Sequence, residues 1–208
     1  MTAIRNASLL VAALEHAWAT IRARHPQVPE AVLVVASGGA GRRLKWGHFA
    51  AGRWRHAGDH HPEVLVGREG LARRAREVLA TLLHEAAHGL ADARRIPDTS
   101  RGGRYHNRRY AALARELGLE VAQVGAIGWS ATTLPEATAT LYAQVLAELE
   151  DRLVLWRRQE MTGQKGSRNL LVCVCGCPRR IRVAPSTLAA APILCAACDL
   201  PFTPDIGA

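Results

Sequence analysis

Residues 81–90 read TLLHEAAHGL and contain the motif H-E-x-x-H at His84, Glu85 and His88. The motif lies in a stretch from Gly70 to about Ala93 with apolar residues at helical spacing, so we expect one long helix there. Four helical residues turn by about 400°, so His84 and His88 project from one face, where two imidazoles can bind one Zn²⁺. Glu85 is rotated by about 100° from His84 and can hold a water without ligating the metal. The pattern predicts a catalytic zinc with Glu85 as the general base.

The residues around the motif are apolar. The sequence TLL precedes it and two alanines lie inside it, which indicates a helix face inside the protein. Two buried histidines beside a buried glutamate need partners, because unpaired polar groups are costly to bury. We therefore favour a metal site over two solvated surface histidines.

A catalytic zinc needs a third protein ligand. Arg94 stands six residues after His88, which excludes the metzincin spacing, in which a histidine occupies that position. The preferred candidate is His106, which follows the glycine-containing loop 96–103 and opens a helix expected over residues 105–117. If the chain reverses direction between the two helices, His106 comes back beside the helix that carries His84 and His88. Four carboxylates remain as alternatives: Asp92, Asp98, Glu116 and Glu120.

Residues 81–119, TLLHEAAHGLADARRIPDTSRGGRYHNRRYAALARELGL, resemble the SprT-like zinc metallopeptidases, whose eukaryotic relatives are the Spartan-type DNA-dependent proteases. An upstream helix, short strands and a cysteine module after a linker also fit this family, and the resemblance extends from about Ala31 to the C-terminus. It implies an α+β fold with a minimal zincin-like metallopeptidase domain. It also implies zinc ligands at His84, His88 and His106 and a catalytic base at Glu85.

All five cysteines lie in the last 36 residues. Two close clusters in an otherwise cysteine-free chain indicate a metal site in a reducing compartment rather than a disulfide framework. Cys195 and Cys198 form a C-x-x-C knuckle, and the sequence before it predicts a strand, a turn and a second strand. This spacing is typical of a zinc ribbon, in which four thiolates hold a structural Zn²⁺. We choose Cys173 and Cys175 as the other pair, because modules of this family carry C-x-C-G, with Cys175 and Cys177 as the alternative.

Periodicity and turn residues predict the remaining elements. We expect helices over 8–24 and 135–159, strands over 31–36, 44–51 and 63–66, and an irregular apolar segment over 119–134. The expected domains are a SprT-like zincin domain at 1–160, a polar linker at 161–168 and a small β-rich zinc ribbon at 169–208.

The chain is basic, with 27 Lys and Arg against 18 Asp and Glu. This balance favours a polyanionic partner, and we expect contacts to the DNA or RNA backbone with little sequence preference. Trp46 and Trp54 could stack on unpaired bases, although hairpin packing is the more ordinary role for them. The arginines expected to contact phosphate are Arg73, Arg74, Arg104, Arg108, Arg179 and Arg180.

The leading hypothesis is a zinc metallopeptidase in which Glu85 assists the attack of zinc-bound water on a protein substrate on or near nucleic acid. Tyr105, Tyr110 or Arg104 could stabilise the oxyanion. The alternative is a non-catalytic nucleic-acid-binding or transcription-associated zinc protein. The glutamate at position 85 favours the enzyme, because a structural site needs only ligands. No apolar run approaches the roughly 20 residues of a membrane span, so we expect no membrane partner and a cytoplasmic protein, with the nucleoid as a further location.

Overall fold

The computed structural model describes residues 7–39, 44–157 and 170–205 of the chain. Helices and small sheets are mixed, which confirms the α+β class. The chain divides into two compact units, Met1–Glu160 and Met161–Ala208. The expected linker, residues 161–168, lies outside the described residues. None of the helices in the described part of the chain has the length and hydropathy needed to cross a membrane.

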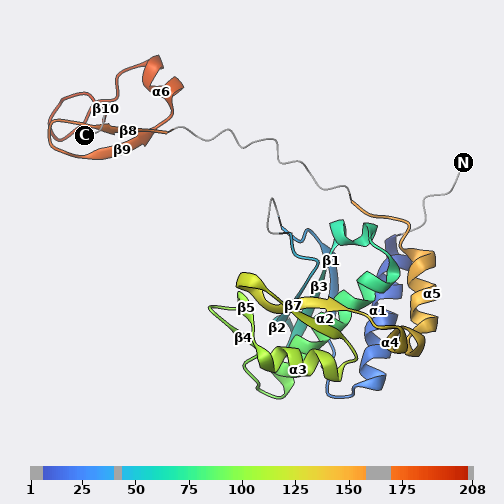
Figure 1. The fold of residues 1–208 in the computed structure, drawn as a ribbon. Helices are drawn as coiled ribbons and strands as arrows, with labels where there is room; N and C mark the ends of the chain where they lie inside the picture. Colours follow the sequence, from blue (N-terminus) through green and yellow to red (C-terminus); the bar gives the residue numbers. More distant parts are fainter. Residues whose placement is uncertain (1–6, 40–43, 158–169, 206–208) are drawn as a thin grey trace, which may run out of the picture. The chain divides into compact units, whose positions relative to one another are not determined.

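Helix α2 (Ala75–Ala93) is the central element of the first unit (Figure 1). Its leucines and alanines are buried, and the helix contacts both α1 (Ala7–Arg24) and α5 (Ala143–Arg152). Apolar residues with helical periodicity along α1 and α2 form the shared core of these helices. The helix that carries the H-E-x-x-H motif is therefore held rigidly from one side.

A three-stranded sheet has the order β1-β3-β2. Strand β1 (Val32–Ala36) is parallel to β3 (Asp59–Gly67), and β2 (Gly47–His56) pairs with β3 in the antiparallel sense. The first residues of β2 lie beside α2, and β2 is the edge strand of this sheet. The hairpin from residue 51 to residue 60 is exposed. The placement of β2 matters for the site, because one of its edges has no strand partner within this sheet.

A second sheet contacts α2 through β7 and has the order β4-β5-β7-β6. Its strands are β4 (Thr99–Ser100), β5 (Tyr105–His106), β6 (Glu120–Val124) and β7 (Gly128–Thr133). The prediction of an irregular segment over 119–134 is wrong, since β6 and β7 occupy it. A register shift between Ala122 and Val124 interrupts the alternation, which explains the weak strand signal.

Two helix starts differ from the prediction. Residues Arg68–Ala72 form a short 3₁₀ helix (η1), and Arg74 is an extended N-cap, so α2 begins at Ala75 and not at Gly70. Helix α3 (Arg108–Glu116) begins after His106, because the Asn107 side chain accepts hydrogen bonds from the first turn and caps the helix. His106 therefore belongs to a short strand.

The helix expected over 135–159 is divided into α4 (Glu136–Leu141) and α5. The break falls at Tyr142, where φ is −110° and ψ is 20°. The Tyr142 side chain is buried in the core between the two helices. The main-chain hydrogen bonds from Tyr142 N to Thr138 O and from Leu146 N to Tyr142 O continue across this point, so the break is a local distortion of the helical path.

The second unit contains a sheet with the order β10-β8-β9. Strand β8 (Leu171–Val174) is central, between β9 (Arg180–Val183) and β10 (Thr203–Pro204). The prediction of a second strand before the C-x-x-C knuckle is wrong, because α6 (Pro185–Ala190) lies there. Its proline is at the helix start and its alanines are strong helix formers, which favours a helix.

Candidate metal centres

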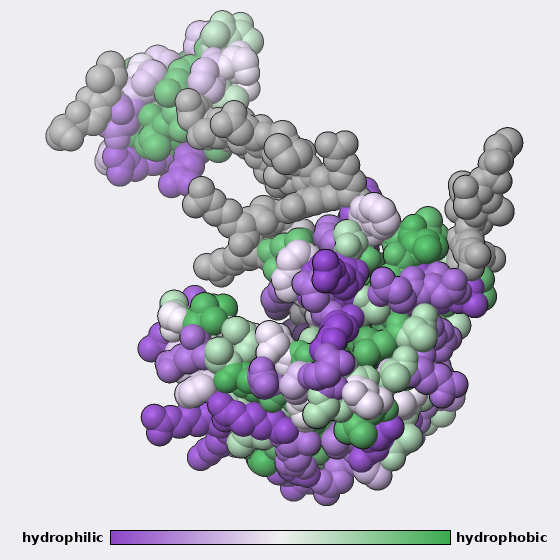
Figure 2. Space-filling model, turned by 45° about the vertical axis from the view of Figure 1, so that its right-hand side comes forward, coloured by the Kyte–Doolittle hydropathy of each residue, from purple (hydrophilic) through white to green (hydrophobic). Residues whose placement is uncertain are grey.

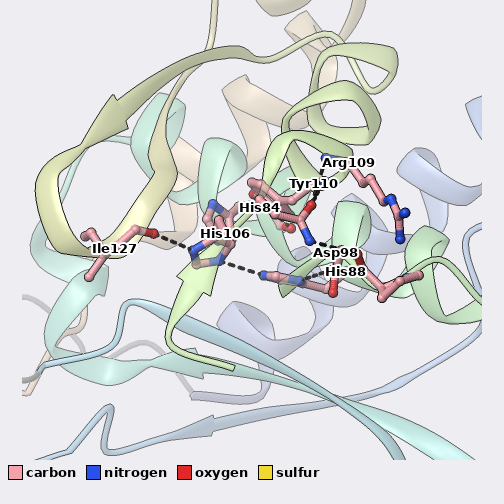
Figure 3. A network of polar contacts seen from close by, with 9 residues as sticks. His84, His88, Asp98, His106, Arg109, Tyr110 and Ile127 are labelled. Atoms are coloured by element: carbon pink, nitrogen blue, oxygen red, sulfur yellow. Dashed lines mark hydrogen bonds and ion pairs between the residues drawn. The ribbon is translucent and has the colours of Figure 1, made fainter. Parts of the chain in front are cut away.

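Three histidines converge next to α2 (Figure 3). His84 and His88 come from α2, and His106 comes from β5. One possible ligand atom of each residue lies within 4.8 Å of the others, and the Nε2 atoms of His88 and His106 are 3.1 Å apart. Two nitrogens that bind one zinc at about 2.0–2.1 Å in a tetrahedral site are about 3.4 Å apart. The cluster therefore fits a single ion.

The carboxylates considered as alternative ligands lie elsewhere. Glu116 pairs with Arg94, and Glu120 accepts a hydrogen bond from Thr133. The group of possible ligands contains neither of these nor Asp92. Asp98 contacts the outer nitrogen of His88 and not the centre of the cluster. Among the described residues, His106 is the third candidate ligand that the structure brings to His84 and His88.

Each histidine has a partner for its outer nitrogen, Nδ1. For His84 it is the Thr132 hydroxyl at 3.3 Å, and for His106 it is the main-chain carbonyl oxygen of Ile127 at 3.4 Å. For His88 it is Oδ2 of Asp98 at 2.5 Å. Partners of this kind fix the tautomer and leave Nε2 free to bind a metal.

The electrostatic surroundings keep two of the imidazoles neutral. Burial, with the nearby His88 and His106, holds the pKa of His84 well below its ordinary value. Burial followed by the charge of His88 also lowers the pKa of His106. Because only the neutral imidazole binds metal, both shifts suit a ligand role.

Tyr110 forms the base of the cluster. Its ring centroid lies 4.5–4.9 Å from those of all three histidines, and its side chain is fully buried. The hydroxyl donates to the main-chain oxygen of His84 at 3.5 Å. Burial raises the pKa of Tyr110 well above its ordinary value, so the phenol stays protonated. The structure gives this residue a supporting position rather than one as an oxyanion donor.

Glu85 is buried beside the cluster, with 4% of its surface exposed. A Cβ atom on Gly47 would lie 2.5 Å from its Oε1, so the glycine leaves the space that the carboxylate fills. Burial raises the pKa of Glu85 to about 7, against the opposing effects of His88, a hydrogen bond from the Phe49 backbone and Lys45. A carboxyl group with a pKa near neutrality can both accept and return a proton.

The histidines and Glu85 line a cavity of about 1210 Å³. Residues of β2 and β7 form parts of its walls, and α2 contributes the face that carries His84, Glu85 and His88. Val124 and Ile127, which are exposed apolar residues near the turn between β6 and β7, also line the cavity. Its volume is above the range of about 300–1,000 Å³ that is common for small-molecule clefts.

The arginines expected to bind phosphate have different surroundings. Arg73 stacks on the Trp46 ring at 4.6 Å and donates to Thr81 and to the Gly70 carbonyl, so it is engaged inside the first unit. Arg180 pairs with Asp205. The remaining four are exposed: Arg74, Arg104, Arg108 and Arg179.

Four cysteines of the second unit form another cluster: Cys175, Cys177, Cys195 and Cys198. Their sulfur atoms lie within 4.8 Å of one another, and adjacent pairs are 3.3 and 3.7 Å apart. Four thiolates around one zinc at about 2.3 Å are about 3.8 Å apart. A hydrogen bond from the Ala197 backbone lowers the pKa of the Cys195 thiol to about 6, whereas the hydrogen bond with Cys175 raises the pKa of Cys177 to about 12, so Cys195 is the sulfur that most readily becomes a thiolate. The cluster is compatible with a zinc ribbon.

The preferred ligand Cys173 is not in this cluster. It lies in the middle of the central strand β8, paired with Ile181 on β9 and Pro204 on β10. Its side chain is fully buried in the small core with Phe202. The structure brings the alternative pair, Cys175 and Cys177, to the C-x-x-C knuckle, because both lie beyond the end of the strand. None of the five cysteines forms a disulfide.

Comparison of the chain with protein-family models, with curated proteins and with solved structures gives no match in any of the three. The geometry and chemistry of the two clusters are therefore the basis for a functional conclusion.

Proposed function

We propose that the protein is a zinc-dependent metallopeptidase of the SprT-like type, with a minimal zincin-like catalytic domain and a structural zinc ribbon. The observation that carries the proposal is the combination of three converging histidines with the buried, non-ligating Glu85 at one cavity. A structural metal site has no need for such a glutamate. A buried carboxyl group is costly unless it has a partner or a function.

The residues have distinct roles in peptide hydrolysis. Zn²⁺ bound by the three histidines would polarise the substrate carbonyl and lower the pKa of water. Glu85 accepts the proton of the attacking water as the new C–O bond forms. It then donates this proton to the amine nitrogen as the C–N bond breaks.

The position of strand β2 favours a polypeptide as the substrate. It is the edge strand of its sheet, and its residues from Gly47 to Phe49 line the cavity beside Glu85. An extended peptide can pair with a free strand edge through main-chain hydrogen bonds, largely independently of its sequence. Such pairing would hold a peptide bond beside the histidine cluster.

The variant Glu85→Gln tests the proposal. It keeps the size of the side chain and removes the base, so cleavage of casein should fall by about 100-fold or more. Zinc content and melting temperature should stay close to wild type. Glu77→Gln is the matched control, because Glu77 lies on the same helix and lines the same cavity but is exposed. Each protein is assayed with and without single-stranded DNA.

Two results would contradict the peptidase. Loss of one zinc in Glu85→Gln would make Glu85 a ligand or a structural residue. A wild-type protein that cleaves no unfolded or DNA-bound protein, with or without DNA, would favour the alternative of a non-catalytic nucleic-acid-binding protein.

Nucleic-acid binding is a second function that the surface supports. Four exposed arginines lie between residues 101 and 109, a segment with no acidic residue: Arg101, Arg104, Arg108 and Arg109. Figure 2 shows hydrophilic residues over much of the visible face of the first unit. We infer that this segment contacts phosphate groups.

Fluorescence anisotropy with labelled single-stranded DNA and RNA tests this second function. Affinity should fall steeply between about 50 and 200 mM salt, because phosphate contacts release counterions. The double variant Arg104→Ala/Arg108→Ala should reduce the salt slope by about 2, one for each lost contact. Arg22→Ala, which removes a positive charge from α1, should bind like wild type. Binding that is indifferent to salt would reject the inference.

A further inference from the structure

We propose that Asp98 is a positioning residue that fixes His88 for metal binding. The inference rests on the histidine site of the proposed function, and it assigns a role outside the three ligands and the base. Asp98 lies in the segment between α2 and β4, ten residues after His88 in the chain.

The contact between the two side chains is short and sheltered. Oδ2 of Asp98 is 2.5 Å from Nδ1 of His88, and the side chains are 16% and 17% exposed. Figure 3 shows the chain of contacts from Asp98 through His88 to His106. An ionised carboxylate accepts from Nδ1–H, so the lone pair of the imidazole is on Nε2, the atom that faces His106.

Asp98 differs from the partners of the other two histidines. His84 contacts a neutral hydroxyl at 3.3 Å, and His106 contacts a neutral carbonyl oxygen at 3.4 Å. The bond from His88 is the shortest of the three, and its acceptor is a carboxylate. Charge-assisted hydrogen bonds are about twice as strong as neutral ones, and they also increase the basicity of the ligand. His88 is therefore the histidine most firmly oriented from outside.

The main chain of the same segment holds the third histidine. The Asp98 carbonyl oxygen accepts from the N–H of Asn107, and the Asn107 side chain donates to the Pro97 carbonyl oxygen at 2.8 Å. Thr99 pairs with His106 across β4 and β5. The segment from Pro97 to Thr99 therefore contacts two of the histidines. The Asp98 side chain contacts His88 on α2, and the main chain of the segment contacts the strand that carries His106. Substitution of the Asp98 side chain should remove only the first of these connections.

Competition with a zinc chelator tests the proposal on the whole 208-residue chain. Asp98→Ala should weaken zinc binding at the histidine site by about 10- to 100-fold, the usual cost of losing a partner of a metal-bound histidine. Asp98→Asn should give a smaller loss, because the amide oxygen still accepts from Nδ1–H but carries no charge. This partial rescue separates orientation of His88 from a general structural role. His84→Ala identifies which phase of zinc release belongs to the histidine site.

Asp92→Asn is the matched control. Asp92 lies on α2 one turn after His88 and lines the same cavity, but it is exposed. Its substitution should leave zinc affinity unchanged. Melting temperature is measured for all variants, and Asp98→Asn decides the question if Asp98→Ala does not fold.

Two results would overturn the proposal. One is an affinity of Asp98→Ala within about threefold of wild type, against the loss expected for such a partner. The other is complete loss of one zinc in both Asp98 variants, as in His84→Ala, which would make Asp98 a ligand. Zinc affinity is measured without a substrate. An inactive wild-type protein would therefore count against the peptidase. The role of Asp98 could still be tested, because the zinc affinity of the variants does not depend on activity.

Discussion

The carboxylate of Glu85 fits beside the histidine cluster because Gly47 has no side chain. An added Cβ would lie 2.5 Å from Oε1 of Glu85 and 2.8 Å from Cγ2 of Thr81. We predict that Gly47→Ala displaces the carboxylate and lowers kcat/KM for casein by about 10- to 100-fold, since a misplacement of about 1 Å has effects of this size. Zinc content should not change, because no ligand is touched.

Gly58→Ala is the control: an added Cβ there meets nothing within 4 Å, although φ is +93°. Gly58→Ala should lose stability and keep activity, and wild-type activity in Gly47→Ala would contradict this account.

The residues of the site were predictable to different degrees. The positions of His84, Glu85 and His88 follow from helical geometry, because the helix that carries them has a long and regular apolar pattern. His106 was chosen for its distance along the chain, and the structure brings it to the other two. Gly47 and Tyr110 gave no local signal for their places beside Glu85 and the rings. Both contacts exist only after β2, α2 and α3 have packed together.

Long elements were predicted better than short ones. Helix α1 begins within one residue of its expected start, because its apolar period persists over several turns. Strand β5 has two residues and exists through pairing with β4 and β7, so the local sequence indicated a helix start instead. The same reason applies to β6 and β7. Pairing with other strands stabilises such short strands, and the local sequence of each strand carries little information about its partner.

In the second unit, the point at which strand β8 ends decides which cysteines can meet. Alternation along β8 directs Cys173 into the small core, where it packs near Phe202. Cys175 and Cys177 lie in the turn after the strand and reach the knuckle. Sequence spacing left both pairs open, because it did not give the point at which the strand ends.

At the scale of the whole chain, the two candidate centres belong to separate units and share no residue. We predict about two zinc ions per chain, one in each cluster. His106→Ala should lose the first and keep the second. Cys177→Ser should do the reverse, and Cys173→Ser should keep both. Metal analysis of the purified variants measures the number of zinc ions per chain. Loss of zinc in Cys173→Ser would show that Cys173 and Cys175, and not Cys175 and Cys177, are the first pair of ligands.

The two units should also respond differently to metal removal. The first unit has an extensive core around α2. The buried residues of the second are four among the described residues: Cys173, Val183, Cys195 and Phe202. A module of this size seldom folds without a metal or disulfides, so we expect zinc binding to supply most of its folding free energy. A strong chelator should therefore abolish hydrogen-exchange protection over residues 170–205 while α2 stays protected, and protection should return when zinc is added. Persistent protection of β8 and β9 in metal-free protein would show that the four thiolates are not what stabilises this unit.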